Sequence, residues 1–226
     1  QSRIDAVADH LFNGCEGDAP GRLNALVSMR RCWLSAACML VPKSLFQSLG
    51  GFDAVNLGVR FSDVDFCLRA EAAGYDAVYH PDATLVHHGS ISMQDEARGK
   101  QKLLEQLLCE ENEHAYMLRT WKSALAQSPN YNRNLDLAST SCIASTTPIR
   151  WDPLLAHQPR LLASRIRGGS GDYRVEQPLW RLRESGQLHS AVMPLLAGGN
   201  VRLPTLLELE RMQCDILLLH TPLSDA

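Results

Sequence analysis

The sequence contains no long apolar run, no paired cysteine motif and no excess of positive charge. Its longest apolar stretches, 36–41 and 216–219, fall far short of the roughly 20 residues that a membrane-spanning helix needs. The seven cysteines include no Cys-x-x-Cys pair, which favours reduced thiols over a disulfide framework or a zinc knuckle. A formal net charge of −3 supplies no basic surface for nucleic acid. We therefore expect a cytoplasmic protein that binds no nucleic acid and meets a membrane only peripherally, at the inner face of the cytoplasmic membrane.

The start of the chain also lacks two features of a natural N-terminus. It opens on Gln1 with neither an initiator methionine nor the basic and apolar regions of a signal peptide, so we expect a piece of a longer protein. The 226 residues are 45% apolar and 21% charged, which is the balance of a globular protein. This length suits one large domain or one and a half.

Hydrophobic spacing predicts helices and short strands in the first part of the chain. A short helix over 43–49 should stop at Gly50 and Gly51, and a second helix should begin at Ser62 with a near capping box and end at Gly74. The remaining predicted elements are short strands over 76–79 and 83–86 and an amphipathic helix over about 94–125, whose apolar face should pack across a sheet.

The last third of the chain alternates strands and helices in βαβ order. It follows a segment over 128–159 that is rich in Ser, Thr, Asn and Pro, which indicates a linker or a strapping segment. The expected elements are a strand over 160–164, a tight glycine loop over 168–171, a helix over 173–184, a strand over 187–196, a helix over 206–212 and a buried strand over 214–220.

Two groups of residues could carry chemistry. Asp63 and Asp65 lie within one helical turn, where one carboxylate could act as a base while the other binds a hydroxyl or a metal. Acids in a first helical turn also simply interact with the helix dipole. His87 and His88 follow a predicted strand, and only one of them should face a site, as a metal ligand. The alternative is a surface histidine beside a packed one.

Five ordered segments resemble the acceptor half of a family-2 glycosyltransferase of the GT-A fold, over roughly residues 8 to 125. They are SAACMLV (35–41), FQSLGGFD (46–53), FSDVDFCLR (61–69), AGY (73–75) and HHGSIS (87–92). Segments at 10–12 and 131–135 are similar to bacterial enzymes that build rhamnose-rich O-antigen and other surface polysaccharides.

The resemblance implies a role for each matching residue. Asp63 would deprotonate the acceptor hydroxyl, and Asp65 would support it. His87, the first of the pair, would help to bind a divalent metal, Mg²⁺ or Mn²⁺, on the nucleotide diphosphate. Ser62 stands where many relatives carry Glu, so some of the acidic character is missing.

The resemblance also implies an acceptor wall and a domain plan. Gly51, Phe52 and Asp53 would shape the wall that receives the acceptor. The expected α/β architecture is the C-terminal half of a GT-A domain over 1–127, the linker over 128–159, and the beginning of a second, Rossmann-like domain over 160–226. This last part resembles the opening of a GT-B glycosyltransferase domain through GSGDYRV (169–175) and the strand over 214–220.

The implied function is metal-dependent, inverting transfer of a sugar from a nucleotide-diphosphate donor to a glycan or lipid-linked glycan in bacterial surface polysaccharide synthesis. Nothing before residue 35 supplies the family's nucleotide-binding half or its Asp-x-Asp motif, so we expect the isolated chain to be inactive. Two alternatives are a metal-dependent hydrolase that uses Asp63, Asp65 and His87, and a non-catalytic glycan-binding fragment.

Overall fold

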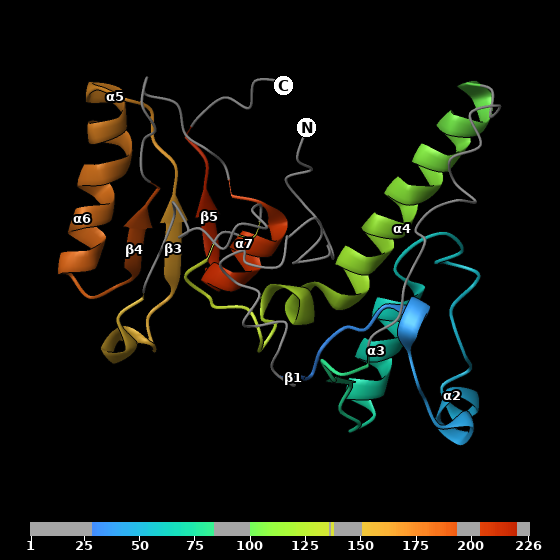
Figure 1. The fold of residues 1–226 in the computed structure, drawn as a ribbon. Coiled ribbons are helices and arrows are strands. Elements are labelled where there is room, and N and C mark those ends of the chain that lie inside the picture. Colours follow the sequence, from blue (N-terminus) through green and yellow to red (C-terminus); the bar gives the residue numbers. More distant parts are fainter. Residues whose placement is uncertain (1–28, 84–99, 136, 138–150, 194–203, 221–226) are drawn as a thin grey trace. The chain divides into compact units, whose positions relative to one another are not determined.

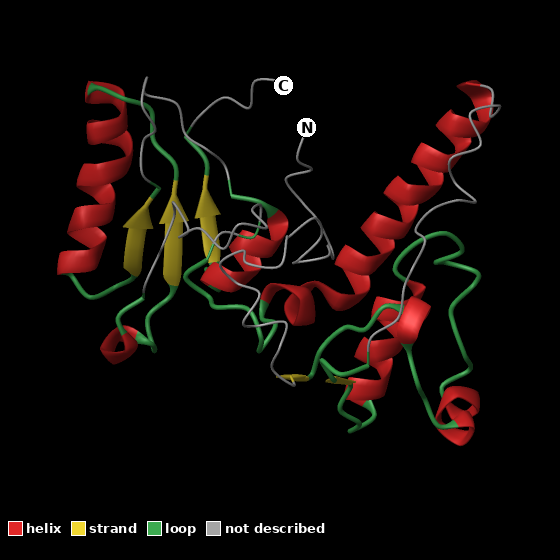
Figure 2. Ribbon diagram, viewed as in Figure 1, coloured by secondary structure: helices red, strands yellow, loops and turns green. Residues whose placement is uncertain are grey.

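The computed structural model describes residues 29–83, 100–135, 137, 151–193 and 204–220 (Figure 1). The chain divides into two compact units, one over 6–132 and the other over 1–5 and 133–226. The described residues are a mixture of helices and short strands (Figure 2). Each unit has its own architecture and is described by itself.

The first unit is mainly helical in its described residues. Its elements are β1 (Met29–Arg30), the 3₁₀ turn η1 (Ala36–Cys38), α2 (Lys43–Ser48), α3 (Ser62–Ala72), β2 (Val78–Tyr79) and α4 (Lys100–Ala126). The strands β1 and β2 pair antiparallel. The predicted strand over 76–79 is thus confirmed in its second half, and most of the segment over 83–86 lies outside the described residues.

Both predicted short helices are confirmed. The chain leaves α2 through Gly50 and Gly51, with φ of 79° and 72°, and passes through Gly74 with φ of 87° after α3. Glycine adopts these left-handed conformations at little cost because it has no Cβ. The predicted capping box is wrong, because Phe61 is the N-cap of α3, with φ of 61° and no side-chain cap.

Helix α4 is confirmed in its described part, with a kink at Trp121, where φ is −121°. Its predicted apolar face is buried in the second half, at Met117 and Leu125, but not in the first half. Leu104, Leu107 and Leu108 are exposed, while Glu110 and Glu113 are buried. Among the described residues α4 contacts α3 and the loop before it, rather than lying across a sheet. The buried acids need polar partners, and the loop before α3 supplies them: its backbone binds Glu113, and the Arg60 side chain pairs with Glu110.

The second unit is built on a parallel sheet, and this confirms the predicted βαβ order. The strand order is β4-β3-β5, and β3 pairs parallel with both neighbours. The elements are η3 (Pro153–Leu155), β3 (Arg160–Ala163), α5 (Gly169–Gly171), η4 (Asp172–Glu176), α6 (Gln177–Glu184), β4 (His189–Val192), α7 (Leu206–Met212) and β5 (Ile216–Leu218). Both β4 and β5 are shorter than predicted, and 194–203 lies outside the described residues.

Alternate residues of β3 build two apolar clusters, one on each face of this sheet. Leu161 and Ala163 pack with Val175 and Leu179 of the helical segment that runs from α5 to α6. Leu162 instead belongs to a second cluster, with Met193 and Met212. Because successive strand residues point to opposite faces, helices cover both faces of the central strand.

The expected glycine loop over 168–171 forms the start of a helix instead. Gly168, with φ of 94°, precedes α5, and α5, η4 and α6 follow one another directly. A Cβ on Gly171 would lie 2.1 Å from the carbonyl oxygen of Ile166. Gly171 therefore allows a close approach of two backbone segments.

Candidate active site around the first turn of helix α3

Asp63 lies in the first turn of α3 and is partly exposed. Its Oδ2 accepts a hydrogen bond of 3.0 Å from the backbone N–H of Ala36, and its Oδ1 accepts one of 2.9 Å from Val64. A carboxylate oxygen has two lone pairs, so both oxygens keep capacity for a further donor such as a hydroxyl. The two backbone contacts hold the carboxylate in one orientation at the surface.

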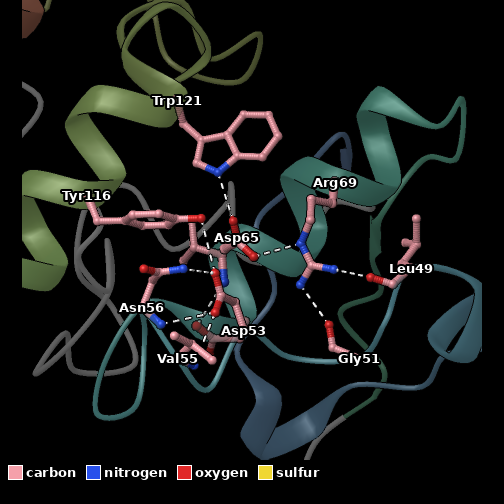
Figure 3. A network of polar contacts seen from close by, with 11 residues as sticks. Leu49, Gly51, Asp53, Val55, Asn56, Asp65, Arg69, Tyr116 and Trp121 are labelled. Atoms are coloured by element: carbon pink, nitrogen blue, oxygen red, sulfur yellow. Dashed lines mark hydrogen bonds and ion pairs between the residues drawn. The ribbon is translucent and has the colours of Figure 1, made fainter.

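Asp65 points the other way, into the protein, and is only 1% exposed. Figure 3 shows its carboxylate between helix α4 and Arg69. Oδ1 accepts a hydrogen bond of 2.8 Å from Nε1 of Trp121, and Oδ2 accepts one of 2.7 Å from Nε of Arg69. Asp65 therefore supports the site from within, by linking α3 to α4.

Arg69 connects this buried acid to the glycine turn after α2. Its two terminal nitrogens donate to the carbonyl oxygens of Leu49 and Gly51, at 2.6 and 2.7 Å (Figure 3). A guanidinium presents its donors in one rigid plane, so the three acceptors are fixed relative to one another. The charge of Asp65 thus helps to define the turn that precedes Phe52.

Gly51 and Phe52, two of the three residues assigned to the acceptor wall, lie on this turn. Gly51 is buried, and a Cβ there would approach the ring of Phe46 to 3.1 Å. Phe52 is 39% exposed, and its ring centroid lies 5.3 Å from that of Phe46 and 5.7 Å from that of Phe66. Part of an anchored aromatic ring is therefore presented at the surface.

Asp53, the third wall residue, organises the loop that follows. Its carboxylate accepts hydrogen bonds from the N–H groups of Val55 and Asn56, from the Asn56 side chain and from the hydroxyl of Tyr116 (Figure 3). The bond from the Asn56 side chain is the main cause that lowers the pKa of Asp53. Burial, and then the bond to Asp53, raise the pKa of Tyr116. These bonds fill about the four lone-pair positions of a carboxylate, so Asp53 acts by shaping the loop.

Helix α4 contributes polar partners that the sequence analysis missed. Besides Tyr116 and Trp121, Glu113 accepts hydrogen bonds from the backbone just before α3, and Glu110 pairs with Arg60 at 3.2 Å. One signal was available in the sequence. Neither glutamate has a Lys or Arg three or four positions away on the helix, the spacing at which exposed acids of a helix commonly form ion pairs.

The proposed metal ligand cannot be placed in this site. His87 and its neighbour His88 lie outside the described residues. Within the part of the chain that the structure describes, no group of three or more His, Cys, Asp or Glu side chains could hold a metal ion. A search of the same residues finds no helix with the length and apolar character needed to cross a bilayer.

Comparison with known proteins gives partial relatives. The chain is 37% identical over 118 residues to the uncharacterized protein y4gI of Sinorhizobium fredii, a match that covers 52% of the chain. It is 43% identical over 60 residues, 26% of the chain, to an N-acetylglucosaminyl-diphospho-decaprenol L-rhamnosyltransferase of Mycobacterium tuberculosis. It is 34% identical over 114 residues, 50% of the chain, to the O-antigen biosynthesis protein RfbC of Myxococcus xanthus.

These matches span only a small share of each relative. They cover 12%, 19% and 8% of the lengths of the three proteins, in the order given. No protein-family model and no solved structure matches the chain. The names of the last two relatives support a glycosyltransferase relationship in polysaccharide synthesis, at low coverage. They lend no support to the GT-B resemblance of 160–226.

Proposed function

We propose that the protein is an inverting glycosyltransferase, which moves a sugar from a nucleotide-diphosphate donor to a glycan or lipid-linked glycan during synthesis of a bacterial surface polysaccharide. The observation that carries the proposal is the contrast between Asp63 and Asp65. One carboxylate is partly exposed and oriented by two backbone N–H groups, while the other is buried and locked to Arg69 and Trp121. This division gives one acid access to a substrate and gives the other a supporting role.

Asp63 would act as the general base. The acceptor hydroxyl donates a hydrogen bond to the carboxylate, and its oxygen attacks the anomeric carbon of the donor sugar from the face opposite the diphosphate. A carbon–oxygen bond forms to the acceptor as the bond to the diphosphate breaks, the proton passes to Asp63, and the anomeric configuration inverts. A positioned base of this kind contributes about 100- to 10,000-fold to the rate.

The turn after α2 would form the acceptor side of the site. Gly51 and Asp53 set the path of the backbone through Arg69 and Tyr116, and Phe52 presents part of its ring. An aromatic face of this kind packs well against the apolar C–H surface of a sugar. The turn and Asp63 are joined through Arg69 and Asp65, so acceptor and base would keep a fixed relation.

A divalent cation, Mg²⁺ or Mn²⁺, belongs to the proposal through the resemblance, with His87 as its candidate ligand. The cation would neutralise charge on the leaving diphosphate. His87 lies outside the described residues, and among the described residues no three suitable ligands come together. No step of the proposed mechanism therefore runs through the metal.

A transfer assay on the native full-length protein tests the proposal. The donors are a panel of nucleotide-diphosphate sugars that includes those of L-rhamnose, and the acceptor is an N-acetylglucosaminyl diphosphate on a short polyprenyl chain, with Mn²⁺ or Mg²⁺. We expect a glycosylated acceptor by mass spectrometry, with inverted anomeric configuration by NMR. Donor cleavage without transfer would indicate a hydrolase. Acceptor binding without any turnover would indicate a glycan-binding module, and either result would contradict the proposal.

A further inference from the structure

A buried carboxylate on α4 holds the backbone that leads into α3. Glu113 is 2% exposed, and it accepts a hydrogen bond of 2.8 Å from the N–H of Val59 and one of 2.6 Å from the N–H of Arg60. Its neighbour on the helix, Glu110, pairs with the Arg60 side chain at 3.2 Å. Hydrogen bonds to an ionised acceptor are among the strongest in proteins, so this contact fixes two successive peptide units.

The residue after this contact needs such support. Phe61 has φ of 61°, in the left-handed region that bulky residues rarely adopt. Its carbonyl oxygen accepts the hydrogen bond from Asp65 N–H that begins α3. Glu113 therefore acts on the last residues before the strained position. The orientation of the first turn of α3, and with it the place of Asp63, depends on how the chain passes Phe61.

In the rest of the loop over 53–61, some residues are anchored and others are exposed. Leu57 is 2% exposed and is anchored by packing in the interior. Asp53 is anchored to α4 by the hydrogen bond from the Tyr116 hydroxyl. Between these anchors Val55 is 93% exposed, and the side chain of Val59, which lies between Leu57 and Arg60, is 48% exposed. A loop clamped in this way presents a defined surface next to Phe52, rather than a variable one.

We propose that Glu113 is a positioning residue for the acceptor: from α4 it fixes the loop over 53–61 and the entry to α3, so that the acceptor hydroxyl meets Asp63. The residue does not touch the reacting atoms. The proposal rests on the proposed glycosyltransferase function. It adds Glu113 to the site, 50 positions after Asp63 in the sequence.

The test is the variant Glu113→Gln in the native full-length protein, with Glu111→Gln as a matched control. Glu111 is exposed on the same helix, so its substitution removes the same charge without touching the loop. Glutamine at position 113 keeps the length of the side chain but turns one acceptor into an N–H₂ donor, which cannot serve an N–H group. One of the two clamped peptide units then loses its partner.

Two readouts separate positioning from simple stability. With the donor and acceptor on which the wild-type protein is active in the transfer assay, we expect kcat/KM for the acceptor to fall about 10- to 100-fold, because small misplacements of a reacting group are costly. The KM for the donor should stay within about twofold of wild type, since the clamp acts on the acceptor side. Hydrogen exchange should accelerate at the amides of Val59 and Arg60, and Glu111→Gln should change neither readout.

The outcomes distinguish this proposal from the one on which it rests. If the wild-type protein transfers no sugar, the proposed function fails and the positioning role falls with it. If the wild-type protein transfers sugar and Glu113→Gln keeps its acceptor kinetics, only the positioning role is overturned. Should Glu113→Gln fail to fold, Glu113→Asp takes its place, because it keeps the charge on a shorter side chain. It should then show a smaller loss of the same acceptor-specific kind, and unchanged acceptor kinetics would overturn the role.

Discussion

Different interactions stabilise the interior of each of the two units. In the unit over 6–132, buried acids join the elements: Asp65 links α3 to Trp121 of α4, and Glu113 of α4 holds the loop before α3. In the unit over 133–226, apolar side chains fill both faces of a parallel sheet. Apolar packing depends on volume and contact, whereas buried charges depend on exact partners. The candidate site lies in the unit over 6–132, which depends on paired buried charges.

Removal of Asp65 should have the largest effect on stability. Asp65→Ala leaves the Arg69 guanidinium without its counter-ion in the interior, which typically costs about 3 to 5 kcal/mol. The side chain of Arg69 keeps 24% exposure, so we expect the lower part of this range, about 3 kcal/mol. Denaturant unfolding, read by hydrogen exchange in α3, measures the loss.

The control for Asp65 is Asp76→Ala. The side chain of Asp76 is 38% exposed and pairs with Arg31 at 3.5 Å. Its substitution should lower the free energy of unfolding by less than about 1 kcal/mol. Equal losses in the two variants would mean that the buried pair does not hold the first unit together.

A cavity in the sheet core should have a comparable but slightly smaller effect, confined to the second unit. Leu162 is fully buried on β3, and Leu162→Ala removes its packing against Met193 and Met212. Such substitutions cost about 2 to 4 kcal/mol. Leu154→Ala, at a side chain that is 82% exposed, is the control and should change little. Faster exchange in α3 of Leu162→Ala would show that the units do not respond separately.

The smallest predicted effect is a pH dependence of the second unit. Burial lowers the pKa of His189, Arg183 and Arg160 lower it further, and Asp152 opposes them. His189 is 6% exposed, and its Nδ1 has no hydrogen-bond partner among the described residues. The unfolded chain therefore binds a proton more readily than the folded one. The stability due to the neutral histidine is complete above about pH 6.5, the unfolded value, and is lost as the pH falls toward the lower folded pKa.

The variant His189→Phe tests this pH dependence. It removes the titrating group and keeps an aromatic ring beside Trp151, whose ring centroid lies 5.0 Å away. We expect the loss of stability of the second unit below about pH 6.5 to flatten in this variant, because no proton is taken up there on unfolding. The exposed His157 offers a control, since His157→Gln should leave the curve unchanged. A wild-type curve that is already flat in this range would contradict the prediction.

Local patterns in the sequence predicted the elements well. Apolar spacing with glycine ends located α2 and α3, and the βαβ alternation located β3, α6, β4, α7 and β5. Spacing located the buried Met117 and Leu125 in the second half of α4 but failed in its first half, where the leucines are exposed and Glu110 is buried. Three-and-four spacing marks an apolar stripe on a helix, but the partners that the helix meets decide whether that stripe is buried.

Only those residues of the candidate site that lie close together in the sequence could be predicted. Asp63 and Asp65 could be nominated because two acids in one helical turn form a visible pattern. The roles that separate them come from Trp121, which lies 56 positions from Asp65, and from the contact of Glu113 with Val59, which spans 54 positions. A hydrogen bond between distant side chains leaves no period or motif in the sequence, so these partners emerge only from the fold.

The most direct test of the account is the turnover rate of Asp63→Asn, measured in the native full-length protein beside Asp82→Asn. Asp82 has a side chain that is 90% exposed, and it supplies a matched loss of one carboxylate away from α3. Asparagine keeps the size of Asp63 but cannot accept the proton, so transfer should fall about 100- to 10,000-fold. The melting temperature should fall only slightly, because the amide oxygen still accepts from one of the two backbone N–H groups and the site is partly exposed to water. Near-normal turnover in Asp63→Asn would contradict the assignment of Asp63 as the base.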